Sequence, residues 1–171
     1  MKPSPNKPFL KFALIVCAFA FPGAIPASGQ TAPPKDCGCK RDFAVKPGSI
    51  DEAFLAYFTA LTNDDREKLV KHSASFTLNS RHQRINLSSV DRQRLLDKLI
   101  ARNVTGFHFC GYLTSTAELR YREDRRRYQL VVCIAYVENG QTKTSGLATI
   151  SCYYVGNRWL IDSLIVENTF R

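Results

Sequence analysis

Apolar residues recur at helical spacing directly after residue 48. They are Ile50, Phe54, Tyr57, Phe58 and Leu61, three or four positions apart, as on one face of an α-helix. Ser49 and Glu52 form a capping box at the start of this run, in which the hydroxyl accepts a backbone N–H and the carboxylate reaches back. The pattern predicts a helix over residues 49–61.

Two further caps predict two further helices. Asp64 with Glu67 can start a short helix that ends at His72. Ser88-Ser89 precedes a third apolar stripe, made of Leu95, Leu96, Leu99 and Ile100. The third helix is expected to end near residues 103–106.

Alternating apolar and polar residues predict strands in the rest of the chain. A strand is expected at Phe76 and Leu78, followed by a loop or bulge over residues 80–84. After residue 106 we predict a meander of four strands with tight turns between them. The first strand covers about 107–122, the second runs from the turn at 123–124 to 138, and the last two cover 141–155 and 158–167. The turns are 123–124, Asn139-Gly140 and Gly156-Asn157.

These turns predict a register for the strands and two largely apolar sheet faces. One face is expected to hold His108, Cys110, Cys133, Ile150, Cys152 and Ile161, and the other Phe107, Leu130, Val132 and Leu160. A slip of one residue would move a strand's whole set to the opposite face. Because the helices can cover only one face, we expect a homodimer through the outer face of the sheet.

The first 29 residues have the composition of a secretory signal peptide. Three lysines precede an apolar run over residues 12–21, and small residues precede Gln30. The run is about half of the ~20 residues that a membrane helix needs, which disfavours an uncleaved anchor. We therefore expect cleavage near Gln30, export to a periplasm or secretion, and no transmembrane span afterwards.

The remaining chain divides into a tail and one domain. Residues 30–48 contain several prolines and glycines and no helical or strand period, which predicts a flexible tail or linker. Residues 49–171 have the usual length of a single domain. Asn86 and Asn103 begin glycosylation sequons, which have meaning only in a eukaryotic secretory host.

Five cysteines lie beyond the signal segment, and an odd count leaves at least one thiol free or bonded between chains. The predicted register holds Cys110, Cys133 and Cys152 more than ~7 Å apart. Any disulfide is therefore expected to involve Cys37 or Cys39. Two thiolates one residue apart lack the usual spacing of metal ligands, so neither a metal nor a cofactor is expected.

The chain is basic, with a formal net charge of +9. This charge suits an acidic polymer or an anionic lipid surface, and equally suits solubility, which we favour. Its densest charge run, residues 120–127, is not interleaved with base-stacking aromatics as a nucleic-acid groove requires. No nucleic-acid partner is expected.

Helices beside an antiparallel sheet make an α+β fold. Segments 57–65 (YFTALTNDD) and 156–161 (GNRWLI) resemble the nuclear transport factor two-like superfamily, which includes ketosteroid isomerase, scytalone dehydratase and polyketide-cyclase-like proteins. The resemblance covers residues 49–167. It implies a cystatin-like cone, in which a curved, mostly antiparallel sheet wraps three N-terminal helices and leaves a pocket at its open end.

The resemblance also bears on chemistry. In its isomerase branch a Tyr donates to the developing oxyanion, and Tyr57 stands where that Tyr is expected. The base and the second donor would fall near residues 77–80 and within 141–155, where this chain has no acid. Steroid-isomerase chemistry is therefore not expected, because no group there can abstract a carbon-bound proton.

The dehydratase branch uses His, Asp and Tyr, and leaves His108 and Asp162 as candidate catalytic residues beside Tyr112 and His82. A His on a mostly apolar strand is more often a hydrogen-bonded core residue, which we favour for His108, and Asp162 could instead face solvent or cap a neighbouring element. His82 between Arg81 and Arg84 could bind an anion or belong to a solvated loop.

An apolar pocket with a few polar groups is the usual form of a small-molecule site. Its expected lining is Phe54, Tyr57, Phe58, Leu61, Leu95, Leu99, His108, Tyr112, Trp159 and Ile161. We expect an exported, non-catalytic module that binds a small apolar ligand or a partner protein. The alternatives are a dehydratase-like or cyclase-like enzyme, and a structural dimerisation component of an envelope or secretion assembly.

Overall fold

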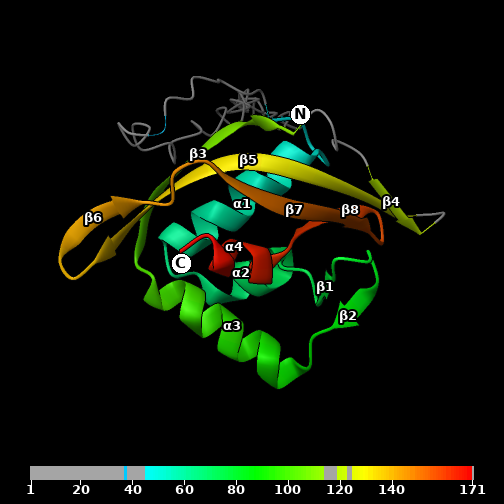
Figure 1. Cartoon of the computed structure of the whole chain (residues 1–171), viewed down its shortest axis with the longest axis horizontal. Helices are drawn as coiled ribbons and strands as arrows, with labels where there is room; N and C mark the ends of the chain where they lie inside the picture. Colours follow the sequence, from blue (N-terminus) through cyan, green and yellow to red (C-terminus); the bar gives the residue numbers. More distant parts are fainter. Residues whose placement is uncertain (1–36, 38–44, 114–118, 123–124, 171) are drawn as a thin grey trace, which may run out of the picture.

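The computed structural model of the chain describes residues 37, 45–113, 119–122 and 125–170. The expected signal peptide, most of the tail and the turn at residues 123–124 lie outside the described residues. The described part is an α+β fold, with helices packed against a curved antiparallel sheet (Figure 1). The predicted fold class is confirmed at this level.

The first three described helices begin at or within one residue of the predicted side-chain caps, and the fourth lies where a strand is predicted. They are α1 (Ile50–Thr62), α2 (Arg66–His72), α3 (Ser89–Ala101) and α4 (Ser163–Asn168). Ser49 Oγ accepts the Glu52 N–H at 3.2 Å, and the Glu52 carboxylate accepts the N–H of Gly48 at 2.6 Å. The start of α2 differs from the prediction, because Asp65 rather than Asp64 accepts the first free N–H, that of Lys68.

The strands form two sheets. A small one pairs β1 (Phe76–Leu78) with β2 (Arg84–Asn86), and the large one has the order β3-β5-β7-β8. Strands β4 and β6 also pair with the long β5. The large sheet contains β3 (Val104–Tyr112), β4 (Leu119–Arg122), β5 (Arg125–Glu138), β6 (Gln141–Thr144), β7 (Ala148–Val155) and β8 (Arg158–Ile161).

Two of the predicted strand boundaries are wrong. The first long strand is divided into β3 and β4, with residues 114–118 between them outside the described residues. The last strand ends at Ile161 instead of residue 167, because Asp162 caps α4 and turns the chain into a helix.

The predicted tight turns at Asn139-Gly140 and Gly156-Asn157 are present, but the register predicted after Asn139-Gly140 is wrong by one residue from β7 onward. Asn139 and Gly140 both have positive φ, as a two-residue hairpin turn requires. Strand β6 pairs Ala135 with Thr144, whereas β7 pairs Val132 with Ala148, so the returning chain contains one extra residue. This shift moves all of β7 and β8 to the opposite face.

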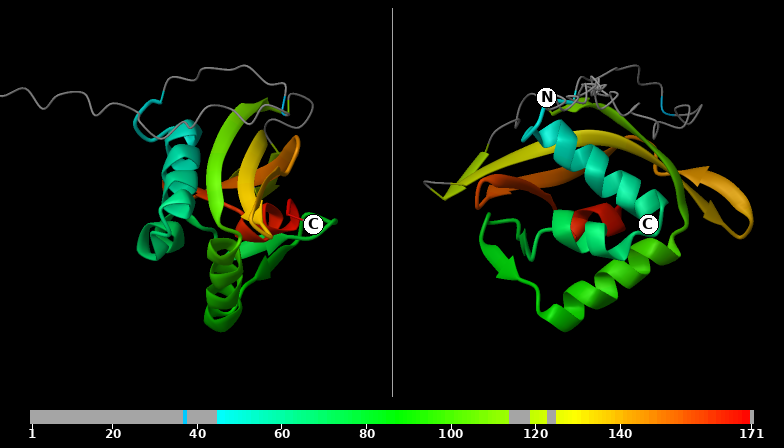
Figure 2. Two further views of the ribbon diagram at one scale, coloured as in Figure 1. Left: turned by 90° about the vertical axis from the view of Figure 1, so that its left-hand side faces the viewer. Right: turned by 180° about the vertical axis from the view of Figure 1, so that it is seen from behind.

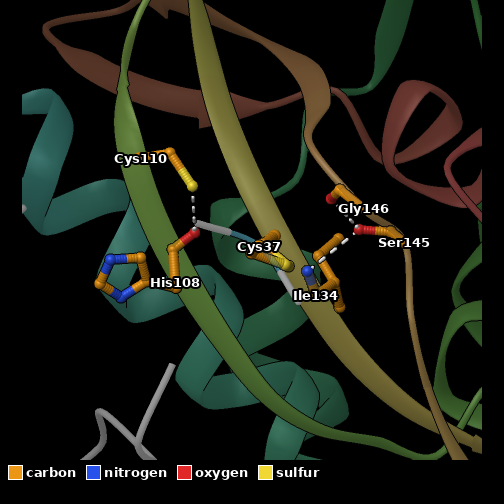
Figure 3. Close-up of a disulfide and its surroundings, with 7 residues drawn as sticks. Cys37, His108, Cys110, Ile134, Ser145 and Gly146 are labelled. Atoms are coloured by element: carbon orange, nitrogen blue, oxygen red, sulfur yellow. Dashed lines mark hydrogen bonds between the residues drawn. A yellow bond between two sulfur atoms is a disulfide. The ribbon is translucent and has the colours of Figure 1, made fainter. Parts of the chain in front are cut away.

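The extra residue is accommodated at Ser145 and Gly146 (Figure 3). Ser145 pairs with Ile134 through both its N–H and its Oγ, which accepts the Ile134 N–H at 3.0 Å. Gly146 follows with a φ of +64°. As a result Ile150, Cys152 and Ile161 face the core together with Phe107, Leu130 and Val132.

The core fills the concave side of the sheet. Helix α1 lies along this side and contacts both β3 and β8, the two ends of the strand order (Figures 1 and 2). The Phe54 ring lies 4.7–5.7 Å from those of Phe58, Phe107 and Phe109. These aromatic side chains occupy the space between α1 and the sheet.

The outer face of the large sheet carries a disulfide between Cys37 and Cys133 (Figure 3). The bond confirms for this pair that a disulfide involves Cys37, and Cys152 is free and buried. Cys110 is also disulfide-bonded.

The expectation about the disulfides depends on a predicted strand register. Between β3 and β5 the observed register differs from the predicted one, and Cys133 lies opposite His108. Farther along the outer face, Phe76 from β1 stacks on Tyr153 at 4.8 Å. No helix within the described ranges is both long enough and apolar enough to cross a membrane.

Candidate functional site

Asp162 is fully buried and all of its acceptor positions are used. Its Oδ1 accepts the N–H groups of Leu164 and Ile165, which is the geometry of a helix cap. Its Oδ2 accepts the hydroxyls of Tyr153, at 2.6 Å, and Thr77, at 2.7 Å. Burial raises the pKa of Asp162, and these hydrogen bonds oppose that rise. The capping interpretation of this residue is confirmed.

Tyr57 is also completely buried, and its hydroxyl lies within a chain of hydrogen bonds. It donates to Ser163 Oγ at 3.0 Å, and Ser163 Oγ donates to Ser73 Oγ at 2.9 Å. Burial raises the pKa of Tyr57 above its ordinary value. The hydroxyl therefore links α1 to the start of α4 and, through Ser163, to the end of α2.

His108 lies on the outer face of the sheet, opposite Cys133. Its side chain is buried, and Nε2 has no hydrogen-bond partner among the residues that the structure describes. Cys110 Sγ lies 3.8 Å from the carbonyl oxygen of His108, on the same strand (Figure 3). The sheet separates His108 from Tyr57, which lies among the core residues of the concave side.

Most residues of the predicted pocket lie in the core. Besides His108, seven of them are buried: Phe54, Tyr57, Phe58, Leu61, Leu95, Leu99 and Ile161. Tyr112 is partly buried and donates to Asp51 Oδ1 at 2.7 Å. Trp159, also partly buried, contributes to the walls of two surface cavities. Ligand binding by the ten residues together stays a prediction.

The first of these two cavities has a volume of about 410 Å³. It lies where the start of α1, the end of α2 and the turn between β7 and β8 meet. Its lining is Gly48, Ser49, Glu52, Ala53, Ala56, Lys71, His72, Asn157, Arg158 and Trp159. The second cavity, of about 430 Å³, is lined by Gly48, Arg126, Tyr154 and Trp159. We call the two together the Trp159 basin.

Two tyrosines hold the indole of Trp159 in place. The register of β7 and β8 sets Trp159 opposite Tyr154, and their ring centroids are 5.0 Å apart. Tyr128 on β5 makes an edge contact with the indole at 5.2 Å. Because the side chain is only partly buried, it also presents apolar surface to both cavities.

Charge is unevenly distributed around the 410 Å³ cavity, where Glu52 is the single acid among the lining residues. Lys71 and His72 come from the end of α2, and Arg158 comes from the start of β8. The pKa of His72 is lowered, first by burial and then by Lys71 and Arg158, while Glu52 opposes the effect. The arrangement can hold an anionic group beside an aromatic surface.

The sequence analysis missed this cluster of basic residues. Lys71 and His72 lie in a short helix with no apolar stripe of its own. Along the sequence, Arg158 is separated from them by α3 and by strands β1 to β7. One available signal was the GNRWLI segment, which places Arg158 beside the single tryptophan of the chain. Within the described ranges no three His, Cys, Asp or Glu side chains are grouped as a metal site requires.

The Arg81–His82–Arg84 trio does not converge on one point. Arg127 Nη1 lies 3.3 Å from His82 Nδ1, whereas Arg84 lies over the Phe76 ring at 4.3 Å. Two of the three side chains therefore already have protein partners.

Comparisons with known proteins give no relative: no family model, no curated protein and no solved structure matches the chain.

Proposed function

We propose that the chain is an exported, non-catalytic binding module of the nuclear transport factor two-like cone fold, and that it binds a small apolar ligand in the Trp159 basin. The single observation that carries the proposal is the position of Trp159. Its indole is fixed by Tyr128 and Tyr154 and forms a wall of two cavities. Ligand sites usually combine such an aromatic surface with a few polar groups.

The order of elements supports the cone fold. Helices α1, α2 and α3 precede the large sheet in the chain, and α1 lies along the concave side in contact with both ends of the strand order. The GNRWLI segment opens the last strand, as the resemblance implies.

The disulfide supports export. Bonds such as Cys37–Cys133 form and persist in oxidising compartments and are rare in the cytosol. The basic start and short apolar run of the first 29 residues point to the same compartment.

The state of the candidate catalytic groups supports a module without catalysis. Turnover needs an acid or base that can reach a substrate proton. Both oxygens of Asp162 and the hydroxyl of Tyr57 are already hydrogen-bonded inside the core. His108 lies on the opposite face of the sheet from Tyr57.

The experiment uses the fluorescence of Trp159, the only tryptophan of the chain. Naphthalene and indole derivatives are titrated into the protein, and calorimetry supplies a second readout. The test variant is Ala56→Phe, which fills the 410 Å³ cavity from α1. Ala56 also borders another cavity of about 480 Å³, whose lining does not include Trp159. The matched control is Thr59→Phe on the same helix, because Thr59 lines only that second cavity.

We expect saturable quenching and heat for the unmodified protein and for Thr59→Phe, and at least tenfold weaker binding for Ala56→Phe. Binding that survives unchanged in Ala56→Phe would place the ligand elsewhere. Conversion of any compound in the panel would contradict the non-catalytic part of the proposal.

A further inference from the structure

We infer that the ligand of the Trp159 basin is an amphipathic anion, whose apolar body lies against Trp159 and whose carboxylate or similar acid group is received by Lys71, His72 and Arg158. The inference rests on the proposed function and names the class of its ligand.

The first argument is the unbalanced charge of the cavity wall. Three basic side chains from two elements line a cavity of about 410 Å³, against the single carboxylate of Glu52. That carboxylate is held by the N–H of Gly48 at the start of α1. It therefore serves the helix cap and is turned to a backbone donor.

The second argument is that, among the described residues, the two exposed basic groups of this wall, Lys71 and Arg158, have no ion-pair partner. The ion pairs among the described residues are Arg66–Asp97, Lys68–Asp65, Arg94–Asp91, Arg102–Glu167 and Lys143–Glu138. Within that part of the chain neither Lys71 nor Arg158 forms an ion pair. Burial lowers the His72 pKa most, and Lys71 and Arg158 lower it further; an anion bound between them would offset their repulsion.

A neighbouring arginine shows the contrast. Arg92 donates from Nη2 to the carbonyl oxygens of Val70 and Ser73, and so satisfies the end of α2. Its guanidinium has a structural role, whereas Lys71 and Arg158 are exposed and line the cavity. Lys71 and Arg158 therefore leave positive charge exposed in the cavity wall that contains the indole.

The third argument is the apolar part of the same wall. Ala53 and Ala56 on α1 and the carbon face of the Trp159 indole provide apolar surface. The volume is within the range of small-molecule sites, roughly 300–1,000 Å³. A ligand with both an aromatic body and an acid group would use both parts of the wall.

The experiment compares two probes of nearly the same shape by calorimetry: naphthalene-2-carboxylate and its neutral carboxamide. A charge-assisted hydrogen bond is stronger than a neutral one by an amount that corresponds to about tenfold in Kd. We expect the carboxylate to bind at least about tenfold more tightly, and Arg158→Gln and Lys71→Gln each to remove most of that preference. The matched control is Arg94→Gln on α3, which should leave it unchanged.

The pH dependence supplies an independent readout. The charged groups that act on His72 are Lys71 on its own helix, Arg158 on β8 and Glu52 on α1. An anion favours the protonated imidazole, so carboxylate affinity should fall as pH rises through the His72 pKa, and carboxamide affinity should not.

The possible outcomes are distinguishable. Equal binding of the two probes would overturn the inference and leave the proposed function in place. Binding of neither probe would overturn both. A carboxylate preference that persists in Arg158→Gln and in Lys71→Gln, two exposed positions, would show that other groups receive the anion.

Discussion

Asp162 shows how a buried acid can be structural. Its four hydrogen bonds join the cap of α4 to Tyr153 on β7 and Thr77 on β1. Replacing it by Ala would remove a cap and leave two buried hydroxyls without their acceptor. We expect the free energy of unfolding to fall by about 3 kcal/mol.

The ionisation of Asp162 makes a second prediction. Its pKa is raised above the ordinary value of 3.8, chiefly by burial, so the folded state binds the proton more tightly than the unfolded state. The contribution of this group to stability is therefore greatest at low pH and is lost as pH rises from about the ordinary value through the raised pKa.

Urea unfolding of the unmodified protein and of Asp162→Asn across this pH range tests the prediction. As pH rises, the unfolding free energy of the unmodified protein should fall relative to that of Asp162→Asn. A difference that is constant, or that moves the other way, would contradict a raised pKa in the folded state.

At the scale of elements, the link between β6 and β7 decides which residues enter the core. Gly146 in this link has a φ of +64°, and no atom lies within 4 Å of where a Cβ would stand. Gly146→Ala should therefore lower stability through the backbone alone, by about 1 kcal/mol. Gly146→Asn is the control, because Asn tolerates this conformation better and should cost less. Equal losses in the two variants would point to a side-chain effect instead.

The same link explains how much of the fold could be read from the sequence. The caps of α1 and α3 and the Asn139-Gly140 turn depend on residues within a few positions, and all three were predicted. The register of β7 depends on hydrogen bonds between Ser145 and Ile134. These residues lie on different strands, so the pattern of neighbouring residues does not predict the bonds.

The site was harder to predict than the fold for two physical reasons. Phe54 and its aromatic neighbours satisfy the pattern of a pocket lining and of a filled core equally well, and only packing distinguishes the two. The basic groups of the Trp159 basin come from a helix end and a strand start that meet only after the sheet has formed. Trp159 alone belongs to both the predicted and the observed lining.

At the scale of the molecule, the Cys37–Cys133 disulfide is expected to be a major source of stability. It closes a loop with a sequence separation of 96 residues. Loop-closure entropy predicts that a bridge across about 100 residues contributes about 4–5 kcal/mol. A Cys37→Ala/Cys133→Ala double variant should lose an amount of this order in urea unfolding. Cys152→Ala, which removes a buried free thiol, is the control and should lose much less.

The homodimer through the outer face remains a prediction. Its basis is weaker than the sequence suggested, because Cys37 and the β1–β2 hairpin contact this face. The large apolar residues that are exposed within the described ranges are Val45, Ile85, Val90 and Leu147. Sedimentation at micromolar concentration should show a dimer that Leu147→Glu weakens. A single monomeric species at every concentration would contradict it.

The span of the disulfide also constrains the order of events during synthesis. Cys37 emerges from the ribosome 96 residues before Cys133, an interval of about 5–20 s at ordinary elongation rates. Throughout this time its thiol has no native partner, while Cys39 is only two positions away. Correct bonding of Cys37 must therefore wait until β5 has been made, which makes closure of this bridge a late step that an oxidant or isomerase can delay or accelerate.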